Sequence, residues 1–134
     1  MISQLTVFLE NEKGRLAAAC RAVSDAGINM HALNLADTSD FGVVRMLTDT
    51  PEAAAEALRE QGYRATVTPV LAVRVPNVPG GLAKLLEFMD EQDANVEYGY
   101  CFSVNEDYAV DVLKADGSDD LEQKLTDAGF EPVR

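Results

Sequence analysis

Two short segments of the sequence have residues suited to binding a small charged molecule. Asn11 to Val23 reads NEKGRLAAACRAV and Asn77 to Met89 reads NVPGGLAKLLEFM, so that Asn, Gly, Leu and Ala recur at the same spacing. In each segment a glycine precedes a predicted helix, whose first backbone N–H groups are unpaired and suit a carboxylate or phosphate. The Asn side chain offers both a donor and an acceptor. The pattern therefore predicts two sites for a ligand that has an ammonium and a carboxylate group.

A second Asn lies at a fixed distance from each of these segments. Asn29 follows Asn11 by 18 residues, and Asn95 follows Asn77 by 18 residues. Each is predicted to stand at the first position of the strand after the helix, where a turn-forming residue is common. That need explains one Asn in each segment but not the matched pair. The simpler interpretation, in which Asn and Gly serve only loop geometry, stays open at this point.

Charge limits the partners that the chain can have. The net charge is −12, and residues 1–69 have 6 Lys/Arg against 9 Asp/Glu, whereas residues 70–134 have 5 against 14. This balance disfavours nucleic acid and anionic membranes as partners. We interpret the acidic second half as a solvated surface in preference to a docking face for a basic partner. Lys13 and Arg15 give the first segment local positive charge and NVPGGL has none, so the two sites should not be equivalent.

The sequence predicts no catalytic or metal centre. His31 is the single histidine, no G-x-S-x-G segment frames a nucleophile, and no pair of Cys or His has the spacing of metal ligands. Cys20 and Cys101 lie in apolar segments, so we interpret both as reduced core residues of a cytoplasmic protein. We find no signal peptide and no apolar run of the roughly 20 residues that span a bilayer.

The elements that position the two segments occur twice in the chain. At an offset of 66, residues with the period of a strand align: Leu5, Val7 and Leu9 with Leu71, Val73 and Val75. Residues with the spacing of an amphipathic helix also align: Leu16, Ala19, Cys20 and Val23 with Leu82, Leu85, Leu86 and Met89. Later residues align at an offset of 67, so one residue is inserted in the second copy between Asn95 and Tyr108. We expect two domains, residues 1–69 and 70–134, with no linker.

Each copy is predicted to have the order strand, helix, hairpin, helix, strand. In the first copy the elements are Gln4–Glu10, Arg15–Ala26, Asn29–Asp37, Phe41–Thr48, a helix between Thr50 and Gly62, and Arg64–Thr68. In the second they are Val70–Pro76, Gly81–Gln92, Asn95–Val104, Tyr108–Lys114, a helix between Ser118 and Gly129, and Phe130–Val133. Thr50 and Ser118 are the predicted caps, and DTSD and NED the hairpin turns. This order predicts an α+β fold of two ferredoxin-like βαββαβ modules. Their antiparallel sheets are expected side by side, as one pseudo-twofold eight-stranded sheet with helices on one face.

The two segments resemble the ACT domains, a family of ferredoxin-like modules that bind amino acids and related molecules and regulate metabolic enzymes. An N-x-x-G-x-L motif before the helix and a G-[IV]-N-[IM] motif after it carry the resemblance. In the first copy they are Asn11-Glu12-Lys13-Gly14-Arg15-Leu16 and Gly27-Ile28-Asn29-Met30. In the second they are Asn77-Val78-Pro79-Gly80-Gly81-Leu82 and Ala94-Asn95-Val96, with Asp93 in place of Gly27. The resemblance covers essentially the whole chain, as a tandem pair with no catalytic domain.

The resemblance implies ligand sites at the seam of two modules that pair through their second strands. One site would combine Asn11, Gly14 and Leu16 with Asn95, and the other Asn77, Gly80 and Leu82 with Asn29. Neighbouring motif residues would complete them: Lys13, Arg15, Met30, Val78, Pro79, Gly81 and Val96. Tyr98 and Tyr100 could wall a pocket for an apolar side chain, or be ordinary packing aromatics.

We therefore expect a non-enzymatic protein that binds an amino acid and acts on a metabolic enzyme or regulator. We expect a homodimer, formed through the open sheet face near Phe8 or through a strand edge, and no cofactor. Two alternatives stay open: a ligand-free structural or interaction module, and an enzyme of ferredoxin-like fold such as an acyl-phosphate hydrolase. Such an enzyme would use a loop arginine and backbone amides around phosphate.

Overall fold

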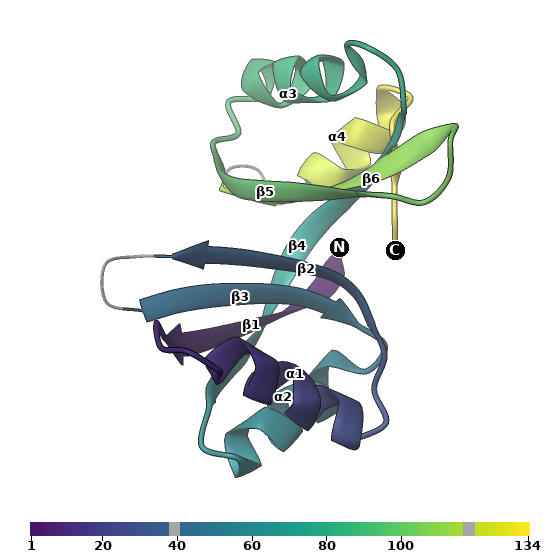
Figure 1. Cartoon of the computed structure of the whole chain (residues 1–134). Coiled ribbons are helices and arrows are strands. Elements are labelled where there is room, and N and C mark those ends of the chain that lie inside the picture. Colours follow the sequence, from purple (N-terminus) through teal and green to yellow (C-terminus); the bar gives the residue numbers. More distant parts are fainter. Residues whose placement is uncertain (38–40, 117–119) are drawn as a thin grey trace. The chain divides into compact units, whose positions relative to one another are not determined.

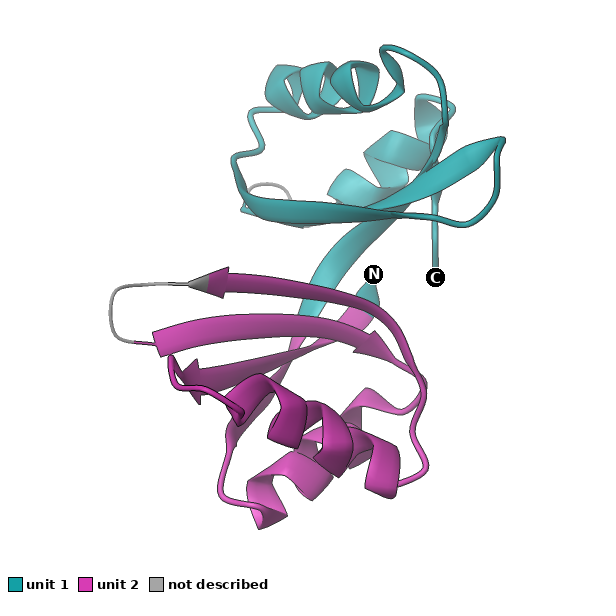
Figure 2. Cartoon of the chain, viewed as in Figure 1, with its two compact units in different colours: residues 1–2, 69–134 teal, residues 3–68 magenta. Residues whose placement is uncertain are grey.

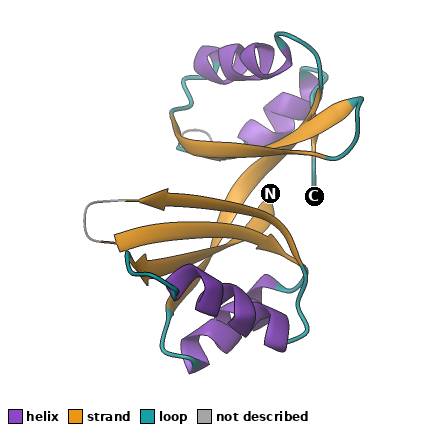
Figure 3. Ribbon diagram, viewed as in Figure 1, coloured by secondary structure: helices purple, strands orange, loops and turns teal. Residues whose placement is uncertain are grey.

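The computed structural model describes residues 1–37, 41–116 and 120–134. The helices and strands of this part have the βαββαβ order twice, with strand β4 ending the first series and beginning the second (Figures 1 and 3). They are β1 (Ile2–Glu10), α1 (Arg15–Asp25), β2 (Met30–Asp37), β3 (Phe41–Thr48), α2 (Pro51–Glu60), β4 (Arg64–Pro76), α3 (Gly81–Glu91), β5 (Val96–Ser103), β6 (Tyr108–Ala115), α4 (Leu121–Asp127) and β7 (Glu131–Pro132). The predicted α+β class is confirmed.

Strand β4 serves both repeats. It runs without a break from Arg64 to Pro76, so the prediction of separate strands at Arg64–Thr68 and Val70–Pro76 is wrong. The described residues hold seven strands instead of eight. Pro69 lies inside β4, since the fixed φ of proline is compatible with an extended chain although its backbone N–H is missing. The strand order is β2-β3-β1-β4-β6-β5, and β7 also pairs with β4. The side-by-side placement of the two sheets stays a prediction.

The chain forms two compact units, coloured separately in Figure 2. The first-repeat unit is residues 3–68 (magenta), and the second-repeat unit is residues 1–2 with 69–134 (teal). In the first-repeat unit, α1 and α2 cover one face of a sheet made of β2, β3, β1 and the first part of β4 (Figure 1). Its buried core consists of Leu5, Val7, Leu9, Ala19, Val23, Val44, Met46, Ala54, Ala55, Leu58 and Ala65.

The second-repeat unit has the same construction. Helices α3 and α4 cover one face of a sheet made of β5, β6, the second part of β4 and β7 (Figure 1). Its buried core consists of Leu71, Val73, Val75, Leu85, Met89, Ala94, Leu113, Leu121 and Leu125. Full burial of each large side chain stabilises the fold by about 1.5–3 kcal/mol, so each unit has a core of its own.

The two hairpins share one register, which locates the inserted residue. Asp37 pairs with Gly42 in the first hairpin, and Ser103 pairs with Ala109 in the second. The offset between repeats is therefore 66 up to Ser103 and 67 from Ala109, and the extra residue lies in the turn between them. Both hairpins also have a register shift at the same place, so that His31 corresponds to Glu97.

Several element ends differ from the predictions. Helix α1 ends at Asp25 and α3 at Glu91, each one residue early, and β7 is shorter than expected. Thr50 is at the N-cap of α2 as predicted, but its side chain makes no capping hydrogen bond. The predicted cap Ser118 and residues 38–40 of the DTSD turn lie outside the described residues.

The two cysteines have different environments. Both are free thiols. Cys20 is half-buried against the first-repeat core, where burial raises the pKa of its thiol. Cys101 is exposed, so its prediction as a core residue is wrong. It lies on the edge strand β5, whose alternate side chains are exposed.

Helix α3 buries only two residues of its predicted apolar stripe, Leu85 and Met89. Leu82 is 44% exposed and Leu86 is 36% exposed, although both belong to that stripe. Phe88 instead packs beside Met89 against the core, and its ring centroid lies 5.3 Å from that of Phe130. The packed face of α3 therefore consists of Leu85 and Met89 of the predicted stripe together with Phe88.

A buried carboxyl lies among the apolar side chains of the second-repeat unit. Asp111 stands on β6 between Val73 of β4 and Cys101 of β5, at the position that Val44 occupies in the first repeat. Its Oδ2 atom has no hydrogen-bond partner among the described residues. Burial raises the pKa of this carboxyl above its ordinary value. The ionised form therefore weakens the folded state.

We predict that Asp111→Val, which restores the residue of the first repeat, stabilises the protein at neutral pH by about 1–3 kcal/mol. The folded state holds the Asp111 proton more tightly than the unfolded chain does. The stability of the wild type therefore falls as pH rises from the ordinary Asp pKa through the raised one, and the gain of the variant grows over the same range. Urea unfolding at pH 4 and pH 7 measures both effects. Asp90→Asn, on the exposed side of α3, is the control and should change stability by less than about 0.5 kcal/mol. A gain that is equal at both pH values would contradict the prediction.

Candidate ligand-binding site

Each helix entrance is built by a glycine in the left-handed conformation. Gly14 has φ 87° and ψ −10°, Gly80 has φ 87° and ψ −6°, and each is the N-cap of its helix. Other L-residues reach this conformation only at a cost of roughly 1–2 kcal/mol. No side chain caps either helix. The first helical bonds run from Ala18 N to Gly14 O (3.0 Å) and from Lys84 N to Gly80 O (2.9 Å). The loop takes the first N–H group of each helix, since Arg15 N donates to Glu12 O (3.3 Å) and Gly81 N donates to Val78 O (3.1 Å).

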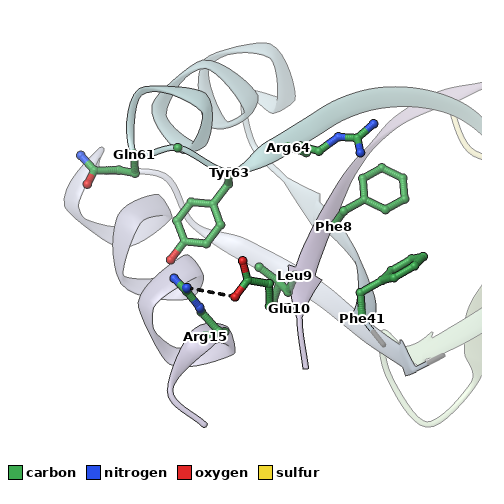
Figure 4. Close-up of a pocket in the computed structure, with 9 residues that line it drawn as sticks. Phe8, Leu9, Glu10, Arg15, Phe41, Gln61, Tyr63 and Arg64 are labelled. Carbon is green, nitrogen blue, oxygen red and sulfur yellow. Dashed lines mark hydrogen bonds and ion pairs between the residues drawn. The ribbon is translucent and has the colours of Figure 1, made fainter. Parts of the chain in front are cut away.

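A cavity lies beside each entrance. The cavity of the first-repeat unit measures about 500 Å³, and Figure 4 shows its lining. Its walls are Phe8, Leu9, Glu10, Arg15, Phe41, Gln61, Gly62, Tyr63 and Arg64. The cavity of the second-repeat unit measures about 650 Å³. Its walls are Arg74, Val75, Pro76, Val78, Pro79, Gly80, Gly81, Lys84, Asp107, Tyr108, Ala128, Gly129, Phe130 and Glu131. Both volumes are in the range of small-molecule sites.

The two cavities occupy the same place in the repeat. Each of the nine positions that line the first cavity has its counterpart among the residues lining the second. Phe8 corresponds to Arg74 on the first strand of the repeat, and Phe41 to Tyr108 on the third. Arg64, which begins β4, corresponds to Glu131, which begins β7. The fold therefore forms this cavity twice, and the side chains give each copy a different chemistry.

The charges at the entrances differ from the predicted asymmetry. Nη2 of Arg15 donates to Oε2 of Glu10 (3.2 Å), and its Nε lies 3.7 Å from Oε2 of Glu12, so the charge of Arg15 is offset by two carboxylates. Lys84 and Arg74 line the second cavity. The prediction that the second entrance has no local positive charge is therefore wrong: the cations come from the adjoining strand and from one turn inside α3, not from the loop.

The loop Asn of the second repeat has a structural partner. Nδ2 of Asn77 donates to the carbonyl oxygen of Glu106 (3.3 Å), and its backbone N–H donates to that of Asp107 (2.8 Å). Asn77 thus ties the α3 entrance to the β5–β6 turn, as the simpler interpretation of loop geometry expects. Asn11 is exposed, and the turn that would hold it lies outside the described residues.

The Asn residues after the helices have matching backbone contacts. The carbonyl oxygen of Asn29 accepts from Asp49 N (3.3 Å), and that of Asn95 accepts from Asp116 N (3.0 Å). Each precedes its strand by one residue, rather than beginning it as predicted, and each is exposed. Within a repeat, the loop Asn and this Asn lie at opposite ends of an 11-residue helix, about 16 Å long. One small ligand therefore cannot contact both Asn residues of the same repeat.

The predicted site residues divide between the cavity and its surroundings. Arg15 lines the first cavity, and Val78, Pro79, Gly80 and Gly81 line the second. The others do not line these cavities: Asn11, Lys13, Gly14, Leu16, Asn29, Met30, Asn77, Leu82, Asn95 and Val96. Their role in binding, and the pairings of Asn11 with Asn95 and of Asn77 with Asn29, stay predictions.

Eight of the nine residues that line the first cavity were not predicted as site residues, and aligned aromatic residues or turns mark three of them. Phe41 aligns with Tyr108, and Gly62-Tyr63 aligns with Gly129-Phe130. These matches were used only to establish the repeat. The start of β3 and the α2–β4 turn come together beside the helix entrance only in the folded sheet, which also adds Arg64 to the wall. Aligned aromatic residues next to aligned turns were the available signal.

His31 pairs with an acidic side chain at the protein surface. Nε2 of His31 forms a hydrogen bond with Oδ1 of Asp49 at the exposed surface. Among the residues that the structure describes, no group of three or more His, Cys, Asp or Glu side chains could hold a metal ion. No helix in this part of the chain is both long enough and apolar enough to cross a membrane.

Residues 1–127 match a family model described as an ACT domain pair. The chain belongs to the ACT domain family. The resemblance that the helix-entrance motifs carry is thus confirmed at the level of the family and of the tandem arrangement. The cavities described above belong to the first and second ACT repeats.

Solved structures resemble this ACT pair over most of its length. Protein BT0572 from Bacteroides thetaiotaomicron is 33% identical, with a TM-score of 0.91, covering 98% of this chain and 90% of that one. The regulatory subunit of aspartate kinase from Thermus thermophilus, in ligand-free form, is 18% identical, with a TM-score of 0.70, covering 92% and 88%. Escherichia coli aspartokinase III in complex with lysine and aspartate is 16% identical, with a TM-score of 0.51, covering 90% of this chain and 28% of that one. No curated protein sequence matches the chain at a significant level.

We predict that Gly80→Ala destabilises the protein by roughly 1–2 kcal/mol and that Gly80→Asn costs less, because asparagine tolerates the left-handed conformation better. Gly81→Ala should also destabilise the protein, although alanine is the better helix former, because its Cβ would lie 2.4 Å from the carbonyl oxygen of Pro76. Urea unfolding of the three variants gives the order. Equal costs for Ala and Asn at position 80 would contradict the conformational explanation.

Proposed function

We propose that this ACT pair is a non-catalytic regulatory protein that binds an amino acid at its helix entrances and acts on a metabolic enzyme or regulator. The observation that carries the proposal is the recurrence of one cavity, at nine equivalent positions, beside a left-handed glycine in both repeats. Helix N-termini favour a carboxylate, and the lining side chains include cations and carboxylates that can pair with a zwitterion.

The proposed regulatory role is supported by the similarity to ACT-containing structures. A regulatory subunit of aspartate kinase shares the fold, and an aspartokinase that has this fold in 28% of its chain has been solved with lysine and aspartate. By analogy, a bound amino acid here would favour one conformation of the ACT pair over another, and the target protein would recognise that conformation. A ligand shifts such an equilibrium only by the difference in its affinity for the two states.

The enzyme alternative has less support. An acyl-phosphate hydrolase would need a loop arginine free to hold phosphate, but Arg15 is engaged by Glu10 and Glu12. His31 is likewise engaged by Asp49, away from the cavity. Both contacts fit a binding protein, in which surface charges are paired and no nucleophile is activated.

A homodimer is the second part of the proposal. Leu33 and Leu35 are exposed on the edge strand β2 of the first-repeat unit. An edge strand with unpaired backbone groups and apolar side chains is a ready surface for association with a second strand. Sedimentation equilibrium should give twice the chain mass, and Leu35→Lys should shift it toward the monomer.

The proposal predicts that at least one of the twenty amino acids stabilises the protein selectively. An amino acid at 100 times its Kd adds about 2.7 kcal/mol to the free energy of unfolding, which raises the Tm by about 5–10 °C for a chain of this size. A thermal-shift screen at millimolar concentration measures the change. No response to any of the twenty would contradict amino-acid binding and favour the ligand-free interaction module.

The crossed pairing that the family resemblance implies has its own test. If Asn11 and Asn95 share a ligand, Asn11→Ala and Asn95→Ala should each weaken the same binding event by about tenfold, the effect of losing one hydrogen bond to a charged group. Asn29→Ala should leave that event unchanged and affect the second one. Isothermal titration of the three variants separates the events. Equal effects of Asn11→Ala and Asn29→Ala on one event would contradict the crossed arrangement.

A further inference from the structure

We propose that the cavity of the first-repeat unit selects an amino acid with an aromatic side chain, whose ring lies against Phe8 and Phe41 and whose carboxylate pairs with Arg64. This inference rests on the proposed function and names the ligand class of one of its two cavities. It concerns residues of the first-repeat unit only, and none of the three was among the predicted site residues.

The strand register brings the two rings together. Phe8 pairs with Val43 across the β1–β3 ladder, and Phe41 lies two residues from Val43 on the same face of β3. Side chains in this diagonal relation on neighbouring strands are within reach of each other when they are aromatic. Both rings are partly open to solvent, at 38% and 43% exposure. They form an apolar wall that is not buried in either core cluster.

Arg64 gives the wall a positive end. Its Cζ atom lies 5.6 Å from the centroid of the Phe8 ring. Figure 4 shows Arg64, Phe8 and Phe41 gathered on one side of the end of β1, with Tyr63, Glu10 and Arg15 on the other. No carboxylate of the described residues lies within 4.0 Å of the Arg64 guanidinium, whereas Arg15 has two such partners. Arg64 is therefore the cation of this cavity that can pair with a ligand carboxylate.

The charges of the lining disfavour a basic ligand. Glu10 and Glu12 offset the charge of Arg15, whereas no carboxylate of the described residues pairs with Arg64. A lysine or arginine ligand would bring another side-chain cation beside Arg64. A neutral aromatic side chain instead stacks on the rings and brings no further charge beside Arg64.

The equivalent positions of the second cavity hold side chains of different chemistry. Arg74 stands where the first repeat has Phe8, and its Cζ atom lies 4.3 Å from the centroid of the Tyr108 ring. The guanidinium of Arg74 thus lies closer to its aromatic ring than that of Arg64 does to Phe8. Glu131 stands where the first repeat has Arg64, so an acid replaces the cation that would hold a ligand carboxylate. The first cavity therefore has two solvent-exposed rings beside a cation, whereas the second has an acid at the position of that cation.

The test is isothermal titration of the full chain with L-phenylalanine, with phenethylamine as the ligand that lacks the carboxylate and L-lysine as the basic ligand. L-phenylalanine should bind, and Arg64→Gln and Phe41→Ala should each weaken it by at least about tenfold. Glu131→Gln and Tyr108→Ala, at the matched positions of the second repeat, should change it by less than about twofold. All four side chains lie at the cavities, outside the buried cores, and circular dichroism checks that each variant is folded.

The results separate this inference from the proposed function. Tight binding of phenethylamine, or equal losses in the first-repeat variants and their second-repeat controls, would overturn the assignment of Arg64 and the ring wall. Binding of L-lysine or another amino acid without L-phenylalanine would overturn the inference and leave the proposed function standing. No binding of any amino acid would overturn both.

Discussion

The shared strand β4 is the constraint on which both repeats depend. Ala65 belongs to the first core, and Leu71, Val73 and Val75 belong to the second, so the odd-numbered side chains of one continuous strand serve both. Successive side chains of a strand point to opposite faces, and this parity has to hold across Pro69, where one unit ends and the other begins. The last strand of the first module and the first strand of the second are therefore parts of one strand. The part of β4 before Pro69 completes the first sheet, and the part after it completes the second.

The repeated cavity follows from this construction. In each unit it lies where the first strand ends, the third strand begins and the chain returns from the second helix, and those three places meet in the ferredoxin-like order of strands. The helix entrances beside it have the same backbone conformation in the two repeats, with a left-handed Gly14 and Gly80. The side chains are not. Phe8 and Arg64 of the first repeat correspond to Arg74 and Glu131 of the second, so duplication kept the position of the site and changed what it can hold.

Much of the fold could be predicted because the hydrophobic periods are local. The alternation in β1 and the spacing in α1 gave elements whose ends were within two residues of those observed. The errors have physical causes outside the local pattern. Two strands were predicted on either side of Pro69, but an extended strand can hold a proline. Leu82 was predicted on the buried face of α3, but it is exposed and Phe88 packs against Phe130 instead. The residues of the cavity walls could not be predicted, because only strand register and the α2–β4 turn bring them together. The crossed pairs of Asn residues cannot be read from either unit alone.

The β5–β6 turn shows where such a duplicated protein is free to change its length. Oδ1 of Asn105 accepts hydrogen bonds from Asp107 N (2.8 Å) and Tyr108 N (3.1 Å), which gives the longer turn a defined shape. The carbonyl groups of that turn then hold Asn77. An insertion in a turn leaves every ladder pair on its original face, whereas one inserted residue in β4 would reverse the inside and outside of half a module. Gene lineages that descend from this duplication should therefore collect insertions and deletions in the hairpin turns, where a new residue can brace the neighbouring helix entrance, and almost none between the two halves of the shared strand.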